Sequence, residues 1–555
     1  KTVVAERKPE IVDSQGVVNT PKNVADIIVK TTLNPLFTNE KFTEWGNYRI
    51  VDICCGSGNF LLAAYEFIIN RYVEYYMKND LETAIQRGIL IRDTANNFKL
   101  SYEQKRTILQ KNIWGVDIDI LAVEVAKFSL LIKLIEESSL YEMECFVKNN
   151  GCRILPSLDN NIKNGNSLVD EKYMQYNQDL LEDPELVEKI KIFNWETELA
   201  GKKFDAIVGN PPYIRVQNMV HFSENEYEYY KSEFSEYETA RTDLLDKYFL
   251  FLEKGLTLLK ANGKMGYIIP HAKYLLPGYL GIIYQQHFIS FLINKQIIHF
   301  GTEQVFKGRS TYTCLLFVEK KERKSFEIGF VKDINRFYAT GAVDMQEYPI
   351  EYLGVAPWTF LSNEIVQTLE KKKEYCQPLE SLVDIFVGLQ TSADPIYIIE
   401  PKEEKEGIIK FIDCRGREWQ IESAITKPCI YDLQLEKYAQ INENRRIIFP
   451  YYQKEKKQVL YSMDEMKQLF PKTLEYLDSF KEELCKRSIN NMSENNWYQF
   501  GRSQSLKRLV KGDHLVWSVL ATQGNYVYDA RTICFTGGGN GPFYGLEKKD
   551  DTRES

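Results

Sequence analysis

Short apolar runs alternate with longer amphipathic stretches over the first 270 residues of this 555-residue chain. The runs with strand character are Tyr48–Ile53, Ile113–Ile118, Asn161–Asn164, Phe204–Val208 and Lys264–Ile269; the longest amphipathic stretches are Phe60–Met77, Leu121–Glu137 and Leu245–Lys260. Strands that alternate with helices in this way form parallel sheets covered by helices. The sequence therefore predicts an α/β fold built on a parallel sheet.

The pattern changes twice further along the chain. After residue 295 the β-rich pieces IIHF, TYTCLLFVE and SFEIGFV are typical of the far edge of the same sheet. From about residue 346 the sequence becomes irregular and rich in Tyr and Lys, so we place a domain boundary near Glu347–Trp358 and predict domains 1–345 and 346–555. The final stretch, TGGGNGPFYGLEKKDDTRES, resembles an interrupted loop, so we expect the second domain to be incomplete at its C-terminus.

Composition excludes several classes of protein. There is no uncharged apolar run of about 18 residues and no apolar signal-peptide core, so neither a membrane span nor secretion is expected. The ten cysteines are scattered without CxxC pairs, which favours reduced thiols, a cytoplasmic location and no zinc. A net charge of −8 excludes a uniformly basic surface but allows a local basic groove. With five histidines, we expect neither metal binding nor histidine catalysis.

A glycine-containing turn and an acid follow two of the predicted strands. Gly56 and Gly58 in the run VDICCGSGNFLL allow a ligand to approach the backbone, although Leu61 stands where a dinucleotide site would have a third glycine. Asp117 and Ile118 end the next strand, where a carboxylate can accept both ribose hydroxyls. Taken singly, these are a tight turn and a solvated acid. Together they indicate a nucleoside ligand without a diphosphate, which S-adenosylmethionine fits.

The run FDAIVGNPPYIR ends a predicted strand on an amide, two prolines and an aromatic ring. Asn210 offers a carbonyl acceptor, and Pro212 restrains Pro211 so that its backbone carbonyl has a fixed direction. Two acceptors can hold both hydrogens of an aromatic amine while Tyr213 stacks on the base. The alternative is a strand-ending turn with this sequence by chance. The probability that Asn or Asp, two prolines and an aromatic residue follow one another somewhere in the chain by chance is roughly one in a hundred.

In their order, these motifs resemble those of the gamma-class amino-methyltransferases that modify adenine in DNA, and most of all the methyltransferase part of type IIG restriction-modification enzymes. The resemblance implies an S-adenosylmethionine-dependent methyltransferase fold, with a Rossmann-like, mostly parallel sheet of seven strands followed by a mixed α+β target-recognition domain. Asp246–Glu253 and Gly263–Pro270 resemble the helix and strand that follow the catalytic motif. Three positions depart from the family: Asn19 replaces a common aromatic, Ile53 and Cys54 replace Pro-Ala, and Asn166 stands where many relatives have Asp.

The same resemblance implies the roles of individual residues. The catalytic residues would be Asn210, Pro211, Pro212 and Tyr213, with Tyr213 and Phe306 against the extruded base; a core role for Phe306 is about as probable. The cofactor would be bound by Thr20, Pro21, Asp52, Gly56, Gly58, Asp117, Ile118, Asn166, Ser167 and Asn210.

Residues 346–555 would read the DNA. Gly388–Tyr397 resembles the opening of such domains, and basic residues are interleaved with aromatics after it. The candidates for DNA contacts are Arg445, Arg446, Arg502, Lys507 and Arg508. Basic side chains hold phosphates, but each stretch alone is more often a solvated face.

The sequence thus predicts a site-specific DNA adenine methyltransferase that acts as a monomer on double-stranded DNA, without a membrane. Three alternatives stay open. Protein glutamine methyltransferases carry the same NPPY chemistry on shorter chains. The chain could be the methyltransferase part of a bifunctional type IIG restriction enzyme whose nuclease lies outside it, since the first motif begins by residue 16. It could also be a DNA-binding specificity subunit with an inactive catalytic fold.

Overall fold

The computed structural model describes residues 20–92, 97–136, 138–241, 246–271, 293–306, 311–349, 368, 371–372, 375–436, 440–455, 457–487, 489, 492–503, 505–506, 508, 514–519, 524–537 and 543–549. Contacts divide the chain into two compact units, residues 1–360 and 361–555. The division falls after the boundary at 345/346 that the sequence predicts, because β11 (Met345–Pro349) pairs with β10 (Ser325–Phe330) in the first unit. None of the helices in the described ranges combines the length and apolar character that a membrane crossing requires.

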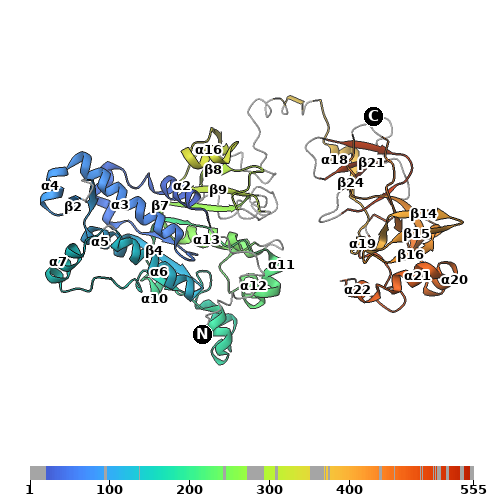
Figure 1. The fold of residues 1–555 in the computed structure, drawn as a ribbon, viewed down its shortest axis with the longest axis horizontal. Coiled ribbons are helices and arrows are strands. Elements are labelled where there is room, and N and C mark those ends of the chain that lie inside the picture. The colour runs from blue at the N-terminus through green and yellow to red at the C-terminus, as the bar shows by residue number, and fades with distance from the viewer. Residues whose placement is uncertain are drawn as a thin grey trace. The chain divides into compact units, whose positions relative to one another are not determined.

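The first unit is built around one sheet whose strand order is β11-β10-β8-β9-β7-β6-β1-β4-β5 (Figure 1). Besides β10 and β11, its strands are β1 (Ile50–Asp52), β4 (Ile113–Asp117), β5 (Ile162–Asn164), β6 (Phe204–Gly209), β7 (Leu259–Pro270), β8 (Ile293–His299) and β9 (Thr313–Glu319). Strands β9 and β11 run opposite to the others. The mostly parallel sheet is confirmed, but within the described residues it has nine strands and not seven, because β10 and β11 extend the edge beside β8.

The described helices of the first unit are α2 (Lys22–Leu33), α3 (Asn59–Asn79), α4 (Leu81–Gln86), α5 (Tyr102–Asn112), α6 (Ile120–Ile135), α7 (Leu140–Asn150), α8 (Lys172–Tyr176), α9 (Pro184–Ile190), α10 (Trp195–Glu198), α11 (Val216–Phe222), α12 (Glu224–Lys231), α13 (Lys247–Leu258) and α16 (Ile334–Thr340). The same unit contains the 3₁₀ turns η1 (Asn39–Asn47), η2 (Leu180–Glu182) and η3 (Glu238–Arg241) and the hairpin of β2 (Leu90–Arg92) and β3 (Phe98–Leu100).

Alternate residues of the central strands enter two different cores. Val51, Ile207 and Tyr267 lie in the core that contains α13, whereas Ile50, Val208 and Ile268 lie in the core that contains α2, α3, α5 and α6. The two buried faces explain why the central strands read as continuous apolar runs.

The second unit is a mixed α+β assembly around a core of its own. Its sheets have the strand orders β12-β24-β21-β22, β13-β18-β17-β23, β14-β15-β16 and β19-β20. The strands are β12 (Val383–Val387), β13 (Ile398–Ile399), β14 (Pro401–Lys405), β15 (Ile408–Ile412), β16 (Glu418–Glu422), β17 (Thr426–Ile430), β18 (Arg445–Ile448), β19 (Tyr451–Lys454), β20 (Lys457–Leu460), β21 (His514–Ser518), β22 (Tyr526–Asp529), β23 (Cys534–Phe535) and β24 (Phe543–Lys548). The helices are α18 (Leu379–Leu382), α19 (Asp394–Tyr397), α20 (Met463–Leu469), α21 (Pro471–Asp478) and α22 (Lys481–Cys485), with η6 (Ser423–Ile425).

Helix α2 packs tightly on the sheet because β7 contains a glycine at the point of contact. A Cβ at Gly266 would lie 2.0 Å from Thr32 Oγ1 and 3.0 Å from Ile28 Cγ2, and both of these residues belong to α2. Distances this short require a backbone shift, because cores have almost no free volume. Gly266 therefore sets the distance between α2 and β7.

Gly266→Ala is expected to destabilise the protein by about 1–3 kcal/mol, because the added methyl group overfills this contact. The measurement is the midpoint of urea unfolding followed by fluorescence. Gly46→Ala is the matched control, since a Cβ there would meet only Tyr72 Oη at 3.9 Å. Equal midpoints for the two variants would contradict the close packing of α2.

Candidate functional site

The carboxyl ends of β4, β1 and β6 lie side by side in the sheet. Parallel pairing sets Asp52 beside Gly115 of β4 and Val51 beside Ile207 of β6. Asp117 ends β4, and the loops that follow β1 and β6 contain the glycine turn and the NPPY sequence. In open α/β sheets this edge is where ligands bind. The structure thus brings together the motifs that the sequence places on three separate strands.

The turn after β1 has the conformation that its glycines allow. Gly56 and Gly58 have φ values of +50° and +90°, in the region that residues with a side chain avoid. A Cβ at Gly58 would lie 3.0 Å from the Cβ of Ala126 in α6, whereas a Cβ at Gly56 would meet nothing within 4 Å. Gly58 is therefore needed for packing, while Gly56 leaves open space over the turn for a ligand.

Asp117 is hydrogen-bonded to the same turn. Its Oδ2 accepts from the backbone N–H of Gly56 at 2.8 Å, and its Oδ1 accepts from the N–H of Asp119 at 2.9 Å. Burial raises the pKa of this carboxyl above its usual value, while the backbone donors oppose the rise. The side chain of Ile118, which follows, is 39% exposed. Asp117 thus connects β4 to the glycine turn, next to an exposed apolar side chain.

Asp52 is completely buried beneath the NPPY loop. Its Oδ1 accepts from the N–H of Cys54 at 3.0 Å, and a Cβ at Gly209 would lie 2.7 Å from the same oxygen. Burial raises the pKa of Asp52 to about 7. Gly209 is not among the predicted site residues; a glycine inside a buried strand is the signal that marks such a close approach.

The loop Gly165–Leu168 lies against the glycine turn. Ser167 Oγ donates to the carbonyl of Ile53 at 2.5 Å, so this hydroxyl joins the two loops. Asn166 Oδ1 accepts from the N–H of Leu168 at 3.1 Å, while Asn166 Nδ2 is buried and has no hydrogen-bond partner among the described residues. An unused buried donor is costly unless a ligand accepts from it. Together with the open space above Gly56, it shows that the site fits a nucleoside cofactor.

The NPPY loop follows β6 directly and is held at both ends. Asn210 Nδ2 donates to Thr20 Oγ1 at 3.1 Å, and Tyr213 Oη donates to the carbonyl of Ile268 in β7 at 3.1 Å. Pro211 is buried, and Pro212 is partly exposed. The two prolines donate no backbone hydrogen bonds, so the loop presents mainly acceptors.

Phe306 lies near Tyr213 but does not form a parallel wall with it. The ring centroids are 6.3 Å apart at an interplanar angle of 64°, and Phe306 is 4% exposed. A base stacked between two rings needs them nearly parallel. In this arrangement Phe306 is a core side chain, and a stacking role would require both rings to turn.

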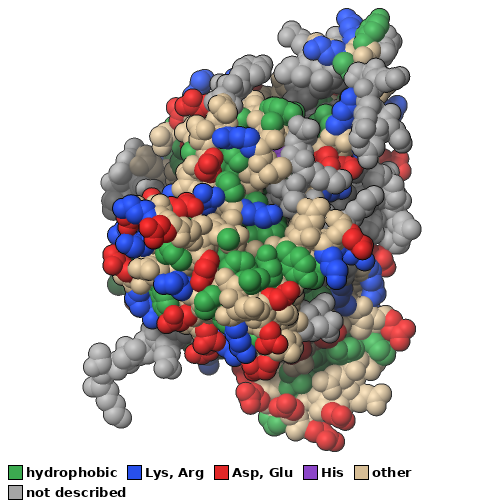
Figure 2. Space-filling view, turned by 90° about the vertical axis from the view of Figure 1, so that its right-hand side faces the viewer, with side chains coloured by type: hydrophobic (Ala, Val, Ile, Leu, Met, Phe, Trp, Pro, Cys, Tyr) green, Lys and Arg blue, Asp and Glu red, His purple; other side chains and the backbone are tan. Residues whose placement is uncertain are grey.

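The predicted DNA contacts of the second unit are partly engaged in ion pairs. Arg445 pairs with Glu400 at 3.1 Å, Arg446 with Glu404 at 3.2 Å, and Arg508 with Asp384 at 3.6 Å. Arg502 is exposed and has no ion-pair partner within the described residues. Lys507 lies outside the described residues, as does the first motif up to Asn19, of which Thr20 and Pro21 are described. Figure 2 shows basic and acidic side chains interleaved over one face of the molecule.

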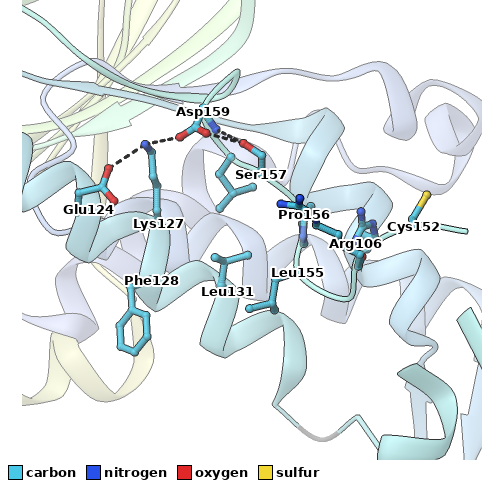
Figure 3. A pocket seen from close by; sticks show the side chains of 12 residues that line it. Arg106, Glu124, Lys127, Phe128, Leu131, Cys152, Leu155, Pro156, Ser157 and Asp159 are labelled. Carbon is cyan, nitrogen blue, oxygen red and sulfur yellow. Dashed lines mark hydrogen bonds and ion pairs between the residues drawn. The ribbon is translucent and has the colours of Figure 1, made fainter. Parts of the chain in front are cut away.

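A surface pocket of about 580 Å³ lies elsewhere on the first unit (Figure 3). It is formed by α5, α6 and the segment 152–159, where Lys127 pairs with Glu124 and Asp159. None of its lining residues is among the predicted site residues. No group of three or more metal-ligating side chains occurs among the residues that the structure describes.

The raised pKa of Asp52 predicts a pH-dependent contribution to stability. Between about pH 3.8 and about 7, the unfolded chain releases the Asp52 proton while the folded protein keeps it. The folded state then binds more protons, so this contribution falls as pH rises through the window and is constant above it. Asp52→Asn removes it. Relative to wild type, the variant should gain thermal stability between about pH 4 and about 7 and show no further change above about pH 8. A difference in Tm between Asp52→Asn and wild type that does not change with pH would contradict a raised pKa for Asp52.

Comparison with known proteins identifies similar sequences. The family model "Eco57I restriction-modification methylase" matches residues 111–306. The chain is 31% identical over 562 residues to the type II restriction enzyme and methyltransferase RM.Eco57I of Escherichia coli, covering 97% of this chain and 52% of that protein. It is 24% identical to the adenine-specific methyltransferase PglX of Streptomyces coelicolor over 37% of this chain and 15% of that protein. The chain thus spans about half the length of RM.Eco57I.

Among solved structures, the type IIL restriction-modification enzyme MmeI in complex with DNA has a TM-score of 0.57 at 13% identity, over 94% of this chain and 60% of that one. This likeness extends through both units and confirms the fold class that the sequence predicts. Residues 111–306 thus match the model of the Eco57I restriction-modification methylases, within a chain that is similar along almost its whole length to about half of a type II restriction enzyme and methyltransferase.

Proposed function

We propose that this chain is a site-specific DNA adenine methyltransferase that transfers the methyl group of S-adenosylmethionine to the exocyclic amine of a flipped adenine in a restriction-modification system. The observation that carries the proposal is the NPPY loop at the carboxyl end of β6, beside the glycine turn of β1. It presents two acceptors and an aromatic ring next to a site that fits a nucleoside. The family of residues 111–306 and the adenine-specific relative support this reading.

The residues around the glycine turn would hold the cofactor. Gly56 gives access to the backbone, Asp117 would accept from the ribose, and Asn166 Nδ2 would donate to the base. Asp52, Gly58, Ile118 and Ser167 would shape the site, which Thr20 and Pro21, just before α2, and Asn210, just after β6, would border. When bound, S-adenosylmethionine supplies an electrophilic methyl group on a positively charged sulfur.

The chain's own contribution is to hold the amine. The lone pair of an aromatic amine is delocalised into the ring, which makes its nitrogen a poor nucleophile. Hydrogen bonds from both amine hydrogens to Asn210 Oδ1 and the Pro211 carbonyl favour a tetrahedral nitrogen whose lone pair can attack. S-adenosylmethionine held beside the glycine turn would supply the methyl group to this nitrogen, and the amine would release its proton to solvent. Positioning and fixed dipoles provide the rate, so no tuned base is required.

Adenine inside a duplex cannot reach this loop, so the base must leave the stack. Tyr213, with its hydroxyl held by β7, is the candidate surface for the extruded ring. Phe306 remains the candidate for the other side, subject to the ring rotation that its present angle requires. We further propose that residues 346–555 read double-stranded DNA, since MmeI, which matches both units, was solved with DNA.

The alternatives differ in what they leave unexplained. A protein glutamine methyltransferase would use the same loop but has no use for a second unit of this size. A nuclease outside this chain is compatible with the comparison, because RM.Eco57I is named as both a restriction enzyme and a methyltransferase and this chain covers about half of its length. An inactive specificity subunit would not need the glycine turn or the NPPY sequence. Monomeric action in the cytoplasm remains a prediction.

Asn210→Ala is expected to lower methyl transfer to DNA by about a hundredfold or more, because one of the two acceptors is lost. The measurement is transfer of tritiated methyl groups into DNA, with S-adenosylmethionine affinity measured in parallel and expected to change little. Asn335→Ala, which alters an exposed Asn on α16, is the control and should keep wild-type activity. Near-normal transfer by Asn210→Ala, or transfer by the wild type into protein and not DNA, would contradict the proposal.

Arg502→Ala is expected to weaken DNA binding and to reduce the slope of log Kd against log salt by about one, because a free guanidinium contacts a phosphate. Arg446→Ala is the matched comparison and should have a smaller effect, since Glu404 already neutralises that side chain. Fluorescence anisotropy with a labelled duplex at several salt concentrations measures both. An equal loss of DNA affinity in Arg502→Ala and Arg446→Ala would contradict the prediction that Arg502 makes the stronger phosphate contact.

A further inference from the structure

The hydroxyl of Thr20 and the side-chain amide of Asn210 are in hydrogen-bond contact although 190 residues separate them in the chain. Asn210 Nδ2 donates to Thr20 Oγ1 at 3.1 Å, and Thr20 is 6% exposed. This is the hydroxyl's one hydrogen bond to a described residue. Thr20 therefore contacts the amide on which the proposed reaction depends.

The fold holds Thr20 in this place. Pro21 follows it directly and is the N-cap of α2, its carbonyl accepting from the N–H groups of Val24 and Ala25 at 3.0 and 3.1 Å. Both of those side chains are buried in the core beneath the sheet. Farther along α2, Gly266 allows the helix to approach β7 closely. The position of Thr20 over the end of β6 is thus set by the packing of a whole helix.

To bind the amine of the substrate, the side-chain amide of Asn210 must point its oxygen at that amine. If its nitrogen pointed there, the hydrogens of the amide would face the hydrogens of the amine and no hydrogen bond would form. The two ends of a carboxamide have nearly the same shape, so packing alone does not select one. A hydroxyl can donate or accept, so contact with Thr20 selects the correct end only when the hydroxyl's own hydrogen is used elsewhere. S-adenosylmethionine bound in the neighbouring site would supply such an acceptor, since it carries a carboxylate.

We propose that Thr20 is a positioning residue that couples cofactor binding to the orientation of the Asn210 amide. An acceptor on the cofactor takes the Thr20 hydroxyl hydrogen, so the Thr20 oxygen must accept from Asn210 Nδ2. Asn210 Oδ1 is then directed at the amine of the substrate. This inference rests on the proposed function and adds to it the reason why the amide faces the substrate correctly only in the loaded enzyme.

The test compares Thr20→Val, which keeps the shape but removes the hydroxyl, with Thr20→Ser, which keeps the hydroxyl. Thr32→Val makes the same change on the same helix, where the hydroxyl donates to the Ile28 carbonyl away from the site. Binding of S-adenosylhomocysteine, the demethylated cofactor, is measured by calorimetry without DNA. Turnover is measured on DNA at saturating S-adenosylmethionine. A Tm close to that of wild type is required of each variant, and Thr20→Ala replaces Thr20→Val if the latter does not fold.

For Thr20→Val we expect about tenfold weaker binding of S-adenosylhomocysteine and about tenfold lower kcat at saturation, the loss of one hydrogen bond in each. Thr20→Ser should restore both values, and Thr32→Val should change neither. In the Asn210→Asp background the effect of Thr20→Val on kcat should disappear, because a carboxylate presents an acceptor in either orientation.

Each other outcome overturns the inference. Weaker binding with unchanged kcat would mean that Thr20 only holds the ligand. Lower kcat with unchanged binding would exclude the coupling to the cofactor, and failure of Thr20→Ser to restore kcat would assign the effect to packing. No change in either quantity would exclude any role. If the wild type itself transfers no methyl group to DNA, the proposed function is wrong. If the wild type is active and Thr20→Val has the same kcat, only the inference about Thr20 is wrong.

Discussion

The parallel hydrogen-bonding of β6, β1 and β4 is the constraint on which the rest of the site depends. Parallel strands place their carboxyl ends at one edge, so the segments that follow them meet there although they are far apart in sequence. Asp52, Asp117 and Asn210 each stand at or just beyond the end of one of these strands. A change in register would move all three, and no single loop could restore the site.

The chemistry proposed here uses few titratable groups. Asn210, two prolines and an aromatic ring form the reacting surface, and none of them needs to change its protonation state. Burial raises the pKa of both carboxyls of the site, Asp117 and Asp52; Asp52 lies beneath Gly209, and its pKa rises to about 7. Its contacts with Cys54 and Gly209 indicate that it supports the loop. Precision of placement replaces acid–base catalysis, which explains why helix packing and close glycine contacts matter so much in this unit.

Much of the first unit follows from the sequence, since apolar runs and glycines report local requirements. The predicted strand 204–208 becomes β6 (Phe204–Gly209), and the glycines at 56 and 58 have the backbone angles that only glycine readily adopts. Pairing between distant segments is less visible. β7 begins at Leu259, inside the predicted helix that ends at Lys260, because Leu259 pairs with Phe204 of β6. The two extra edge strands and the contact between Thr20 and Asn210 likewise depend on partners far along the chain.

The second unit shows the same limit for charged residues. Arg445, Arg446 and Arg508 read as a basic surface in the sequence, yet each forms an ion pair with an acid from a distant part of the chain. A list of basic residues does not reveal such pairs, because cross-strand neighbours are set by register. Arg502, which has no such partner among the described residues, is the stronger candidate for a phosphate contact.

Mapping of modified bases in DNA from cells that express this protein tests the central claim most directly. The account predicts N6-methyladenine at every copy of one short sequence, and none in cells that express Asn210→Ala. Unmodified adenines throughout, or methyl groups found on cytosine or on protein glutamine in place of adenine, would contradict it.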